Sequence, residues 1–197
     1  MGIMRRGLRV LAVGVAAIGC ASPIPPPTTS PTPVPTGLAH FESDSAAYDY
    51  PASWKQQNSR RALGSHALLF VHLAPFDLPD PCIQLANGGT SCGIWPRDPL
   101  PDNSVVMSWV HWDFFGEEPD PSFGPAVDVG GRTGYRNEDP PDEGCAHIGG
   151  LREIIVRVWF EEAPYNWEDF SACFSGPDAT TNVNAFDALL GSFTYTR

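Results

Sequence analysis

Basic residues are scarce in this chain of 197 residues. Lys and Arg together number 12, against 23 Asp and Glu, and Lys55 is the only lysine. The formal net charge is −11 at pH 7. Nucleic acids and anionic membrane faces attract proteins through clustered Lys and Arg side chains. The composition therefore argues against a protein that binds nucleic acid or an anionic membrane face.

The N-terminal part lacks an apolar run long enough for a transmembrane helix, which needs about 20 residues, because Val10–Ile18 is roughly half that length. Three arginines precede this run within the first nine residues, and Gly19 separates it from Cys20. A basic start, a short apolar run and a small residue are the layout of a secretory signal peptide. The sequence thus predicts an exported, extracytoplasmic protein.

A cysteine directly after the small residue resembles the lipobox of bacterial lipoproteins, in which signal peptidase cuts before a Cys that becomes lipidated. The resemblance implies that residues 1–19 are removed and that Cys20 anchors the mature protein to the bacterial cell membrane. Ala17 stands where the lipobox most often has Leu. An ordinary cleaved signal peptide and an uncleaved anchor therefore remain alternatives, and the pair Arg5-Arg6 leaves the Sec and twin-arginine export routes both open.

Residues 22–37 read SPIPPPTTSPTPVPTG, with Pro at seven of sixteen positions. Proline-rich segments without a hydrophobic pattern adopt extended polyproline II and act as semi-rigid spacers. We expect residues 20–38 to form a tether for a single domain over residues 39–197. A proline-rich ligand for a recognition domain is the alternative interpretation.

The sequence also lacks a CxxC pair, and its five histidines show no paired ligand spacing, which argues against a zinc site. We expect neither a metal nor a cofactor. An even number of further cysteines in an exported chain predicts two disulfides, with three possible connectivities. These cysteines are Cys82, Cys92, Cys145 and Cys173. The turn sequence Asn87-Gly88-Gly89 lies between the first two, so we pair Cys82 with Cys92 and Cys145 with Cys173.

Several segments have the alternating or β-branched apolar pattern of strands. The strongest are 67–73, 104–115 and 154–160, and weaker ones are 130–136 and 170–174. Near the end of the chain, Val183, Phe186 and Leu190 have the spacing of a helix face within Thr180–Leu190. The segment 75–101 carries six prolines and is interpreted as an insertion or a long ordered loop.

Three motifs resemble the PsbP-like and Mog-like superfamily, and in particular its exported lipoproteins of the LpqN type. They are YDYPASWK at residues 48–55, GGRTGYR at 130–136 and FDALLGSFTY at 186–195. The resemblance implies an α/β fold in which an antiparallel sheet carries helices on both faces. It also implies a non-enzymatic binding or accessory module of the cell envelope, with an envelope protein or a small hydrophobic ligand as partner. The proline-rich segment 75–101 departs from the family pattern.

An enzyme is the alternative in a different functional class. Residues 89–93 read GTSCG, the GxSxG string of the α/β-hydrolase nucleophile elbow, where a strand-to-helix turn exposes the serine. Asp128 and His147 follow Ser91 in the order of a catalytic triad. The following Ile94-Trp95-Pro96 does not readily start a helix, and Cys92 is assigned to a disulfide. We therefore expect no catalytic residue here and interpret GTSCG as a disulfide-closed turn. A purely structural envelope protein is the third possibility.

Four other groups have a functional and a structural interpretation. His72 and His111 share a site only if their strands are neighbours and their rings face each other. The acidic groups 117–120 and 138–143 are solvated loops or calcium ligands. The pairs Glu161-Glu162 and Glu168-Asp169 serve glycoside cleavage only at set separations in space. The tryptophans are core residues or line a ligand groove, and we favour the core; they are Trp109, Trp112, Trp159 and Trp167.

Overall fold

A computed structural model describes residues 37–196, apart from 60–66, 81, 114–120, 139, 161–165 and 178. These residues belong to one compact unit, Val34–Arg197. The predicted signal peptide, Cys20 and most of the predicted tether lie outside the described residues.

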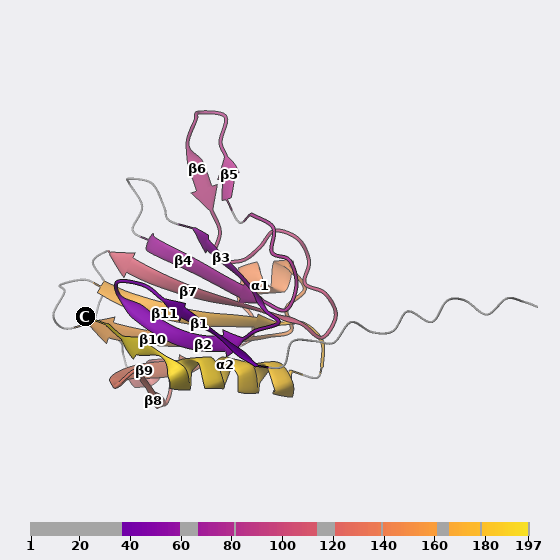
Figure 1. Cartoon of the computed structure of the whole chain (residues 1–197). Helices are drawn as coiled ribbons and strands as arrows, with labels where there is room; N and C mark the ends of the chain where they lie inside the picture. Colours follow the sequence, from indigo (N-terminus) through magenta and orange to yellow (C-terminus); the bar gives the residue numbers. More distant parts are fainter. Residues whose placement is uncertain are drawn as a thin grey trace, which may run out of the picture. The chain divides into compact units, whose positions relative to one another are not determined.

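Within the described residues the chain is mainly β-structure (Figure 1). The strands are β1 (Leu38–Glu42), β2 (Ala46–Pro51), β3 (Lys55–Ser59), β4 (Ala67–Ala74), β5 (Cys82–Gln84), β6 (Thr90–Cys92), β7 (Val105–Asp113), β8 (Ala126–Val129), β9 (Arg132–Asn137), β10 (Arg152–Phe160), β11 (Asn166–Phe174) and β12 (Thr194–Tyr195). The helices are α1 (Glu143–His147), α2 (Thr180–Ser192) and the 3-10 turn η1 (Pro121–Phe123).

The largest element is a seven-stranded sheet in the order β3-β4-β7-β11-β10-β9-β8, antiparallel throughout. A second sheet has the order β1-β2-β12, and β5 and β6 form a separate hairpin. The hairpin projects away from the large sheet (Figure 1). The strongest sequence patterns, at 67–73, 104–115 and 154–160, correspond to β4, β7 and β10 in the middle of this arrangement.

The main core lies between the large sheet and the layer formed by the small sheet and α2. Successive strand side chains point to opposite faces of a sheet. Alternate residues of the central strands therefore reach this core together with Tyr48 of β2, Phe186 of α2 and Phe193. The contributing residues of β7, β10 and β11 are Val105, Met107, Trp109, Ile154, Val156, Val158, Phe170, Ala172 and Phe174.

A second, smaller core covers the opposite face of the same strands. Val106 of β7 and Cys173 of β11 point to this face and pack against Trp95 and Ile148. Trp95 belongs to the connection between β4 and β7, and Ile148 directly follows α1. Both faces of β7 and β11 are thus buried, which explains why the sequence of β7 is a nearly continuous apolar run rather than a clean alternation.

The predicted α/β sandwich with helices on both faces is wrong. The structure is a mainly β fold, in which α2 is the only helix of more than five residues within the described part of the chain. One face of the large sheet is covered by α2 together with a second sheet. The other face is covered by the five-residue α1 and by residues 75–101 between β4 and β7, which we call the proline-rich connection. Proline has no backbone N–H and cannot sit in a helix interior, so the connection covers the sheet as a loop.

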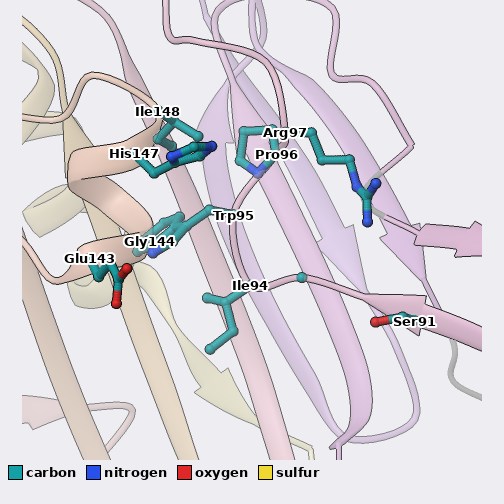
Figure 2. A pocket seen from close by; sticks show the side chains of 10 residues that line it. Ser91, Ile94, Trp95, Pro96, Arg97, Glu143, Gly144, His147 and Ile148 are labelled. Atoms are coloured by element: carbon teal, nitrogen blue, oxygen red, sulfur yellow. The ribbon is translucent and has the colours of Figure 1, made fainter.

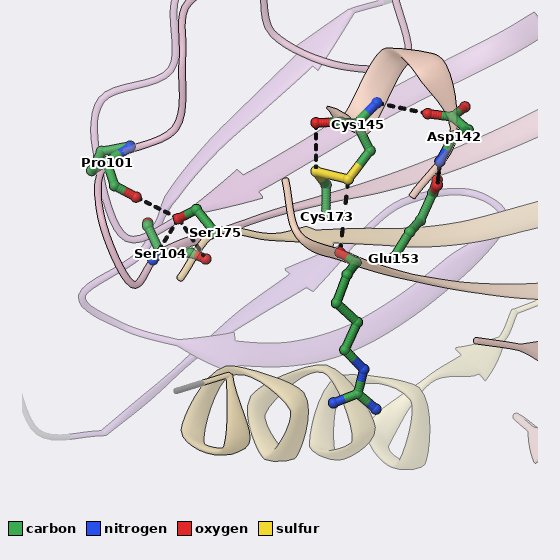
Figure 3. The surroundings of a disulfide bond; sticks show 8 residues. Pro101, Ser104, Asp142, Cys145, Glu153, Cys173 and Ser175 are labelled. Carbon is green, nitrogen blue, oxygen red and sulfur yellow. Dashed lines mark hydrogen bonds between the residues drawn. A yellow bond between two sulfur atoms is a disulfide. The ribbon is translucent and has the colours of Figure 1, made fainter. Parts of the chain in front are cut away.

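The predicted disulfide between Cys145 of α1 and Cys173 of β11 is confirmed, with a Cα–Cα distance of 5.6 Å (Figure 3). A Cβ at Gly150 would collide with both sulfur atoms, so the chain passes this bond only with glycine. In the hairpin, Cys82 is disulfide-bonded and lies opposite Cys92 in the register of β5 and β6. The side chain of Cys92 lies outside the described residues, so its pairing with Cys82 stays a prediction.

Removal of the Cys145–Cys173 bond by the double substitution Cys145→Ser, Cys173→Ser tests its contribution to stability. The bond closes a loop of 28 residues. We expect the free energy of unfolding to fall by about 3–4 kcal/mol, because the unfolded chain regains loop entropy. Urea unfolding followed by tryptophan fluorescence measures the change. An unchanged midpoint and slope would show that the bond does not stabilise the domain.

Candidate functional site

A cleft of about 690 Å³ lies between the β6 side of the proline-rich connection and α1 (Figure 2). It is larger than the cavity of about 290 Å³ that lies beside Phe123 and Glu153. Its lining residues come from residues 91–97 and from α1 with the residue that follows; they are Ser91, Gly93, Ile94, Trp95, Pro96, Arg97, Glu143, Gly144, His147 and Ile148. Two segments that are about 50 residues apart in the sequence therefore meet at one site.

Trp95 forms the floor of the cleft. Its side chain is only 8% exposed and packs in the second core with the disulfide residue Cys145. A Cβ at Gly144 would lie 2.8 Å from Cδ1 of Trp95, which is closer than real Cβ contacts. Gly144 therefore lets α1 approach the indole ring. The residue at this position of α1 helps set the shape of the cleft.

The wall formed by α1 is held by a network of polar contacts and by the disulfide (Figure 3). Oδ1 of Asp142, the N-cap residue, accepts a hydrogen bond of 2.6 Å from the N–H of Cys145. Oε2 of the buried Glu153 accepts a hydrogen bond of 2.7 Å from the N–H of Asp142. Burial raises the pKa of Glu153. The five-residue helix thus gains its order from tertiary contacts, since so short a helix is not stable alone.

The end of the proline-rich connection is anchored at Ser175, which follows β11. The Oγ of Ser175 donates a hydrogen bond to the carbonyl of Pro101 and accepts one of 2.9 Å from the N–H of Ser104 (Figure 3). The N–H of Leu100 also donates to the carbonyl of Ile148, at 2.8 Å. These contacts fasten the connection to both α1 and the sheet, so that the cleft is a preformed feature.

His72 of β4 holds the middle of the connection. Its Nε2 donates a hydrogen bond of 2.7 Å to the carbonyl of Ile94, and its side chain is 1% exposed. Burial lowers the pKa of His72, although the hydrogen bond to Ile94 opposes this effect. His72 lies below the lining of the cleft and positions Ile94, so it is a positioning residue for the site.

The charged lining residues stand on different walls. Arg97 and Ser91 lie on the side of β6, whereas Glu143 and His147 project from α1, with Trp95 between the two walls (Figure 2). No ion pair involves Arg97 within the described part of the chain. The other described arginines all have a partner: Arg136 pairs with Glu138 and Asp187, Arg152 with Glu138, Arg157 with Asp169, and the guanidinium of Arg132 lies over Phe160 and Tyr195.

Ser91, Asp128 and His147 do not have the geometry of a hydrolase catalytic triad. Ser91 lies within β6 opposite Ile83, in a hairpin rather than at a strand-to-helix turn. His147 lines the same cleft as Ser91, but from the opposite wall (Figure 2). Asp128 lies in β8 at the edge of the large sheet, where its Oδ1 accepts the N–H of Gly131 at 3.3 Å. The three residues are not brought together.

His72 and His111, which the sequence left open as a shared site, do not share one. Their strands β4 and β7 are neighbours, but His111 pairs with Leu69 and His72 with Ser108. His72 faces the connection, whereas His111 lies on the face of the main core. Side chains alternate along each strand, and the register puts the two rings on opposite faces.

Glu168 and Asp169 also lie on opposite faces, so they cannot flank one substrate bond. Glu168 is 2% exposed and lies 2.9 Å from Nδ1 of His111 and 3.3 Å from the hydroxyl of Tyr195. Asp169 binds Arg157 instead, at 2.7 Å. Glu161-Glu162 lies outside the described residues. The buried Glu168 joins β7, β11 and β12, which closes the end of the main core.

The tryptophans do not form the lining of the cleft apart from Trp95. Trp109 is 5% exposed in the main core, as favoured from the sequence. The other three lie in one row on the opposite face, where the register pairs Trp112 with Trp167 and Trp167 with Trp159. The rings of Trp159 and Trp167 are stacked at 5.8 Å.

Within the described residues no group of three or more His, Cys, Asp or Glu side chains is placed to hold a metal ion. The acidic group 117–120 lies outside them. Of the second group, Glu138 pairs with Arg136 and Arg152, and these partners lower the pKa of Glu138 against the effect of burial. Asp142 caps α1, and Glu143 lines the cleft. The acidic residues of the group 138–143 thus have three separate roles: an ion pair, a helix cap and a place in the cleft lining.

Comparisons with protein-family models, with curated proteins and with solved structures found no match. No helix in the described part of the chain combines the length and the apolar character needed to span a membrane. The site therefore has to be interpreted from its own residues. Sequence patterns had drawn attention to Ser91, to His147 and, within the acidic group 138–143, to Glu143, but they contained no signal for Arg97 or the role of Trp95.

Substitution of Gly144 by Ala tests how the cleft floor is built. The added methyl group would displace Trp95, so we expect a loss of about 1–3 kcal/mol in unfolding free energy and a shifted indole N–H resonance of Trp95 in NMR spectra. Gly191→Ala is the matched control, because a Cβ there meets nothing within 4 Å. Equal behaviour of the two variants would contradict the packing role of Gly144.

The pH dependence of stability tests the role of His72. Its pKa is lowered in the folded state, so folding favours the neutral ring, and the stability present above about pH 6.5 should be lost as the pH falls below that value. Between pH 7 and 5 the wild type should lose stability relative to His72→Gln, whose amide donates a hydrogen bond but does not titrate. Urea unfolding at each pH measures the difference, and parallel curves would contradict it.

Proposed function

We propose that this protein is an exported lipoprotein, anchored to the bacterial cell membrane through Cys20, whose domain acts as a non-enzymatic binding module of the cell envelope. The observation that carries the binding role is the preformed cleft over Trp95. It has an apolar floor, a few polar side chains on its walls and a volume of about 690 Å³. Ligand sites in proteins commonly have these features.

The anchoring part of the proposal rests on the sequence of residues 1–20. A diacylated cysteine is expected to anchor the protein stably, because each buried methylene contributes about 0.8 kcal/mol and stable attachment takes two chains. The buried disulfide Cys145–Cys173 supports an oxidising compartment, since structural disulfides persist outside the cytosol. The tether would then present the acidic domain at a distance from the membrane.

An envelope protein and a small ligand with an apolar part are both candidate partners for the cleft. The separation of Ser91, Asp128 and His147 favours binding over hydrolysis. A purely structural role would leave the cleft without a ligand. Lipidation at Cys20 follows from the resemblance to exported lipoproteins. The PsbP-like fold is no part of the proposed function, because the domain is mainly β-structure.

Substitution of Cys20 by Ala tests the anchor. The wild type should sediment with membranes and incorporate an alkyne-labelled palmitate, whereas Cys20→Ala should do neither, because it offers no thiol for acylation. Ser22→Ala is the control within the same segment. If Cys20→Ala remains membrane-bound, the anchor is an uncleaved helix or a protein partner, and lipidation is refuted.

A fragment screen by two-dimensional NMR tests the binding role. We use the full-length protein carrying Cys20→Ser, so that lipid does not limit solubility. Binding at the cleft should shift the amide signals of residues 93–97 and 143–148 together with the indole N–H of Trp95. The same fragments should lose these shifts in Gly93→Trp, which fills the cleft. Shifts confined to other surfaces would refute the cleft as the binding site.

A further inference from the structure

We propose that the ligand of this cleft is zwitterionic: a short peptide with free termini, whose carboxylate is bound by Arg97 and whose ammonium group is bound by Glu143. An apolar side chain of the peptide lies between them, over Trp95 and Ile94. The inference rests on the proposed function of the cleft as a binding site, and it names the class of ligand.

The first observation is that two opposite charges line the cleft and neutralise neither each other nor a neighbour. Arg97 and Glu143 are both exposed, and no ion pair or hydrogen bond of either side chain occurs within the described residues. They extend from different walls, with Trp95 between them (Figure 2). Elsewhere in the same domain arginine side chains form ion pairs with carboxylates, as Arg136, Arg152 and Arg157 do.

The second observation concerns the net charge. A chain with a formal charge of −11 repels ligands that carry several negative charges, and the cleft offers a single arginine against them. A ligand with one anionic group and one balancing cation suffers no such repulsion. Guanidinium binds a carboxylate through two parallel hydrogen bonds, and a carboxylate such as that of Glu143 accepts hydrogen bonds from an ammonium group. Charge complementarity thus selects a zwitterion.

The third observation is the apolar surface between the charges. Ile94 is 37% exposed, as one of four exposed large apolar side chains among the described residues, and it borders Trp95 and Pro96 in the lining. Burial of such surface by an apolar ligand group contributes about 25 cal/mol per Å². A peptide supplies this group between its two charged ends, whereas a free inorganic ion does not.

The fourth observation is that the walls are held in place before any ligand binds. Glu143 is on α1, which the Asp142 cap and the Cys145–Cys173 bond attach to the sheet. The Arg97 wall is attached through Ile94, whose carbonyl is bound by His72. Fixed walls lower the entropic cost of binding a small ligand. Such an arrangement suits recognition of both ends of a short peptide.

Four versions of one peptide separate the charges in an experiment. The probes are Ala-Phe, its N-acetyl form, its C-terminal amide, and the form with both caps, each also made with one and two inserted alanines. Binding to the full-length Cys20→Ser protein is followed by the indole N–H signal of Trp95. We expect a free peptide to bind about tenfold more tightly than either singly capped form, since each cap removes one charge-assisted interaction.

Two variants assign each end of the peptide. In Arg97→Gln the free acid and the amide should bind equally, and in Glu143→Gln the free amine and the N-acetyl form should bind equally. Lys55→Gln and Asp77→Asn are the controls, because they remove one charge of each sign from exposed residues outside the lining. The controls should keep the full preference of the wild type.

Any other result of the peptide-binding experiment refutes one specific part of the proposal. If the doubly capped peptide shifts Trp95 as strongly as the free peptide, the cleft binds apolar groups and the zwitterion is wrong, while the binding role stands. If only one terminus matters, the ligand carries a single charge and the assignment of the other residue is refuted. If no probe shifts Trp95 while fragments from the screen do, the peptide class is refuted. If neither probes nor fragments bind, the proposed function of the cleft fails as well.

Discussion

The structure depends on the burial of both faces of the strands β7 and β11. An antiparallel sheet commonly leaves one face in water, but here apolar side chains of the same strands point both ways, so each face needs a cover. One cover is made of regular elements, the small sheet and α2. The other is the proline-rich loop together with the short α1, and the only strand pair in that loop, β5 with β6 among the described residues, projects away from the large sheet (Figure 1). The loop must therefore be attached to the domain by individual contacts.

Those attachments also create the candidate site. Trp95 packs in the second core, and His72 binds the carbonyl of Ile94. The Cys145–Cys173 bond joins α1 to the sheet beside the indole ring of Trp95. A loop and a short helix that are each fixed to the sheet leave a cleft where they do not meet. The cleft is thus a consequence of how the second face is covered, and its charged residues lie on elements held for structural reasons.

The buried Glu168 shows how the two sheets are joined at the other end of the core. A carboxylate that is 2% exposed is costly unless it is hydrogen-bonded, and its contacts with His111 and Tyr195 come from β7 and β12. Two residues that had separate functional interpretations in the sequence, His111 and Glu168, are therefore partners in one network. The acidic residue that was grouped with Glu168, Asp169, belongs to the other face.

The sequence by itself determined the positions of the central strands and the helix α2, because a strong apolar pattern needs no long-range information to be interpreted. It also predicted the Cys145–Cys173 pair, since only three connectivities were possible and a turn separated the other two cysteines. It did not determine the fold class, because a family resemblance in short motifs does not say what covers a sheet. The partners of His72, His111 and Glu168, and the placement of Arg97 and Glu143 on the two walls of one cleft, were decided only by the tertiary structure. Strand register and loop path set which side chains share a face, and both arise from contacts between residues far apart in the chain.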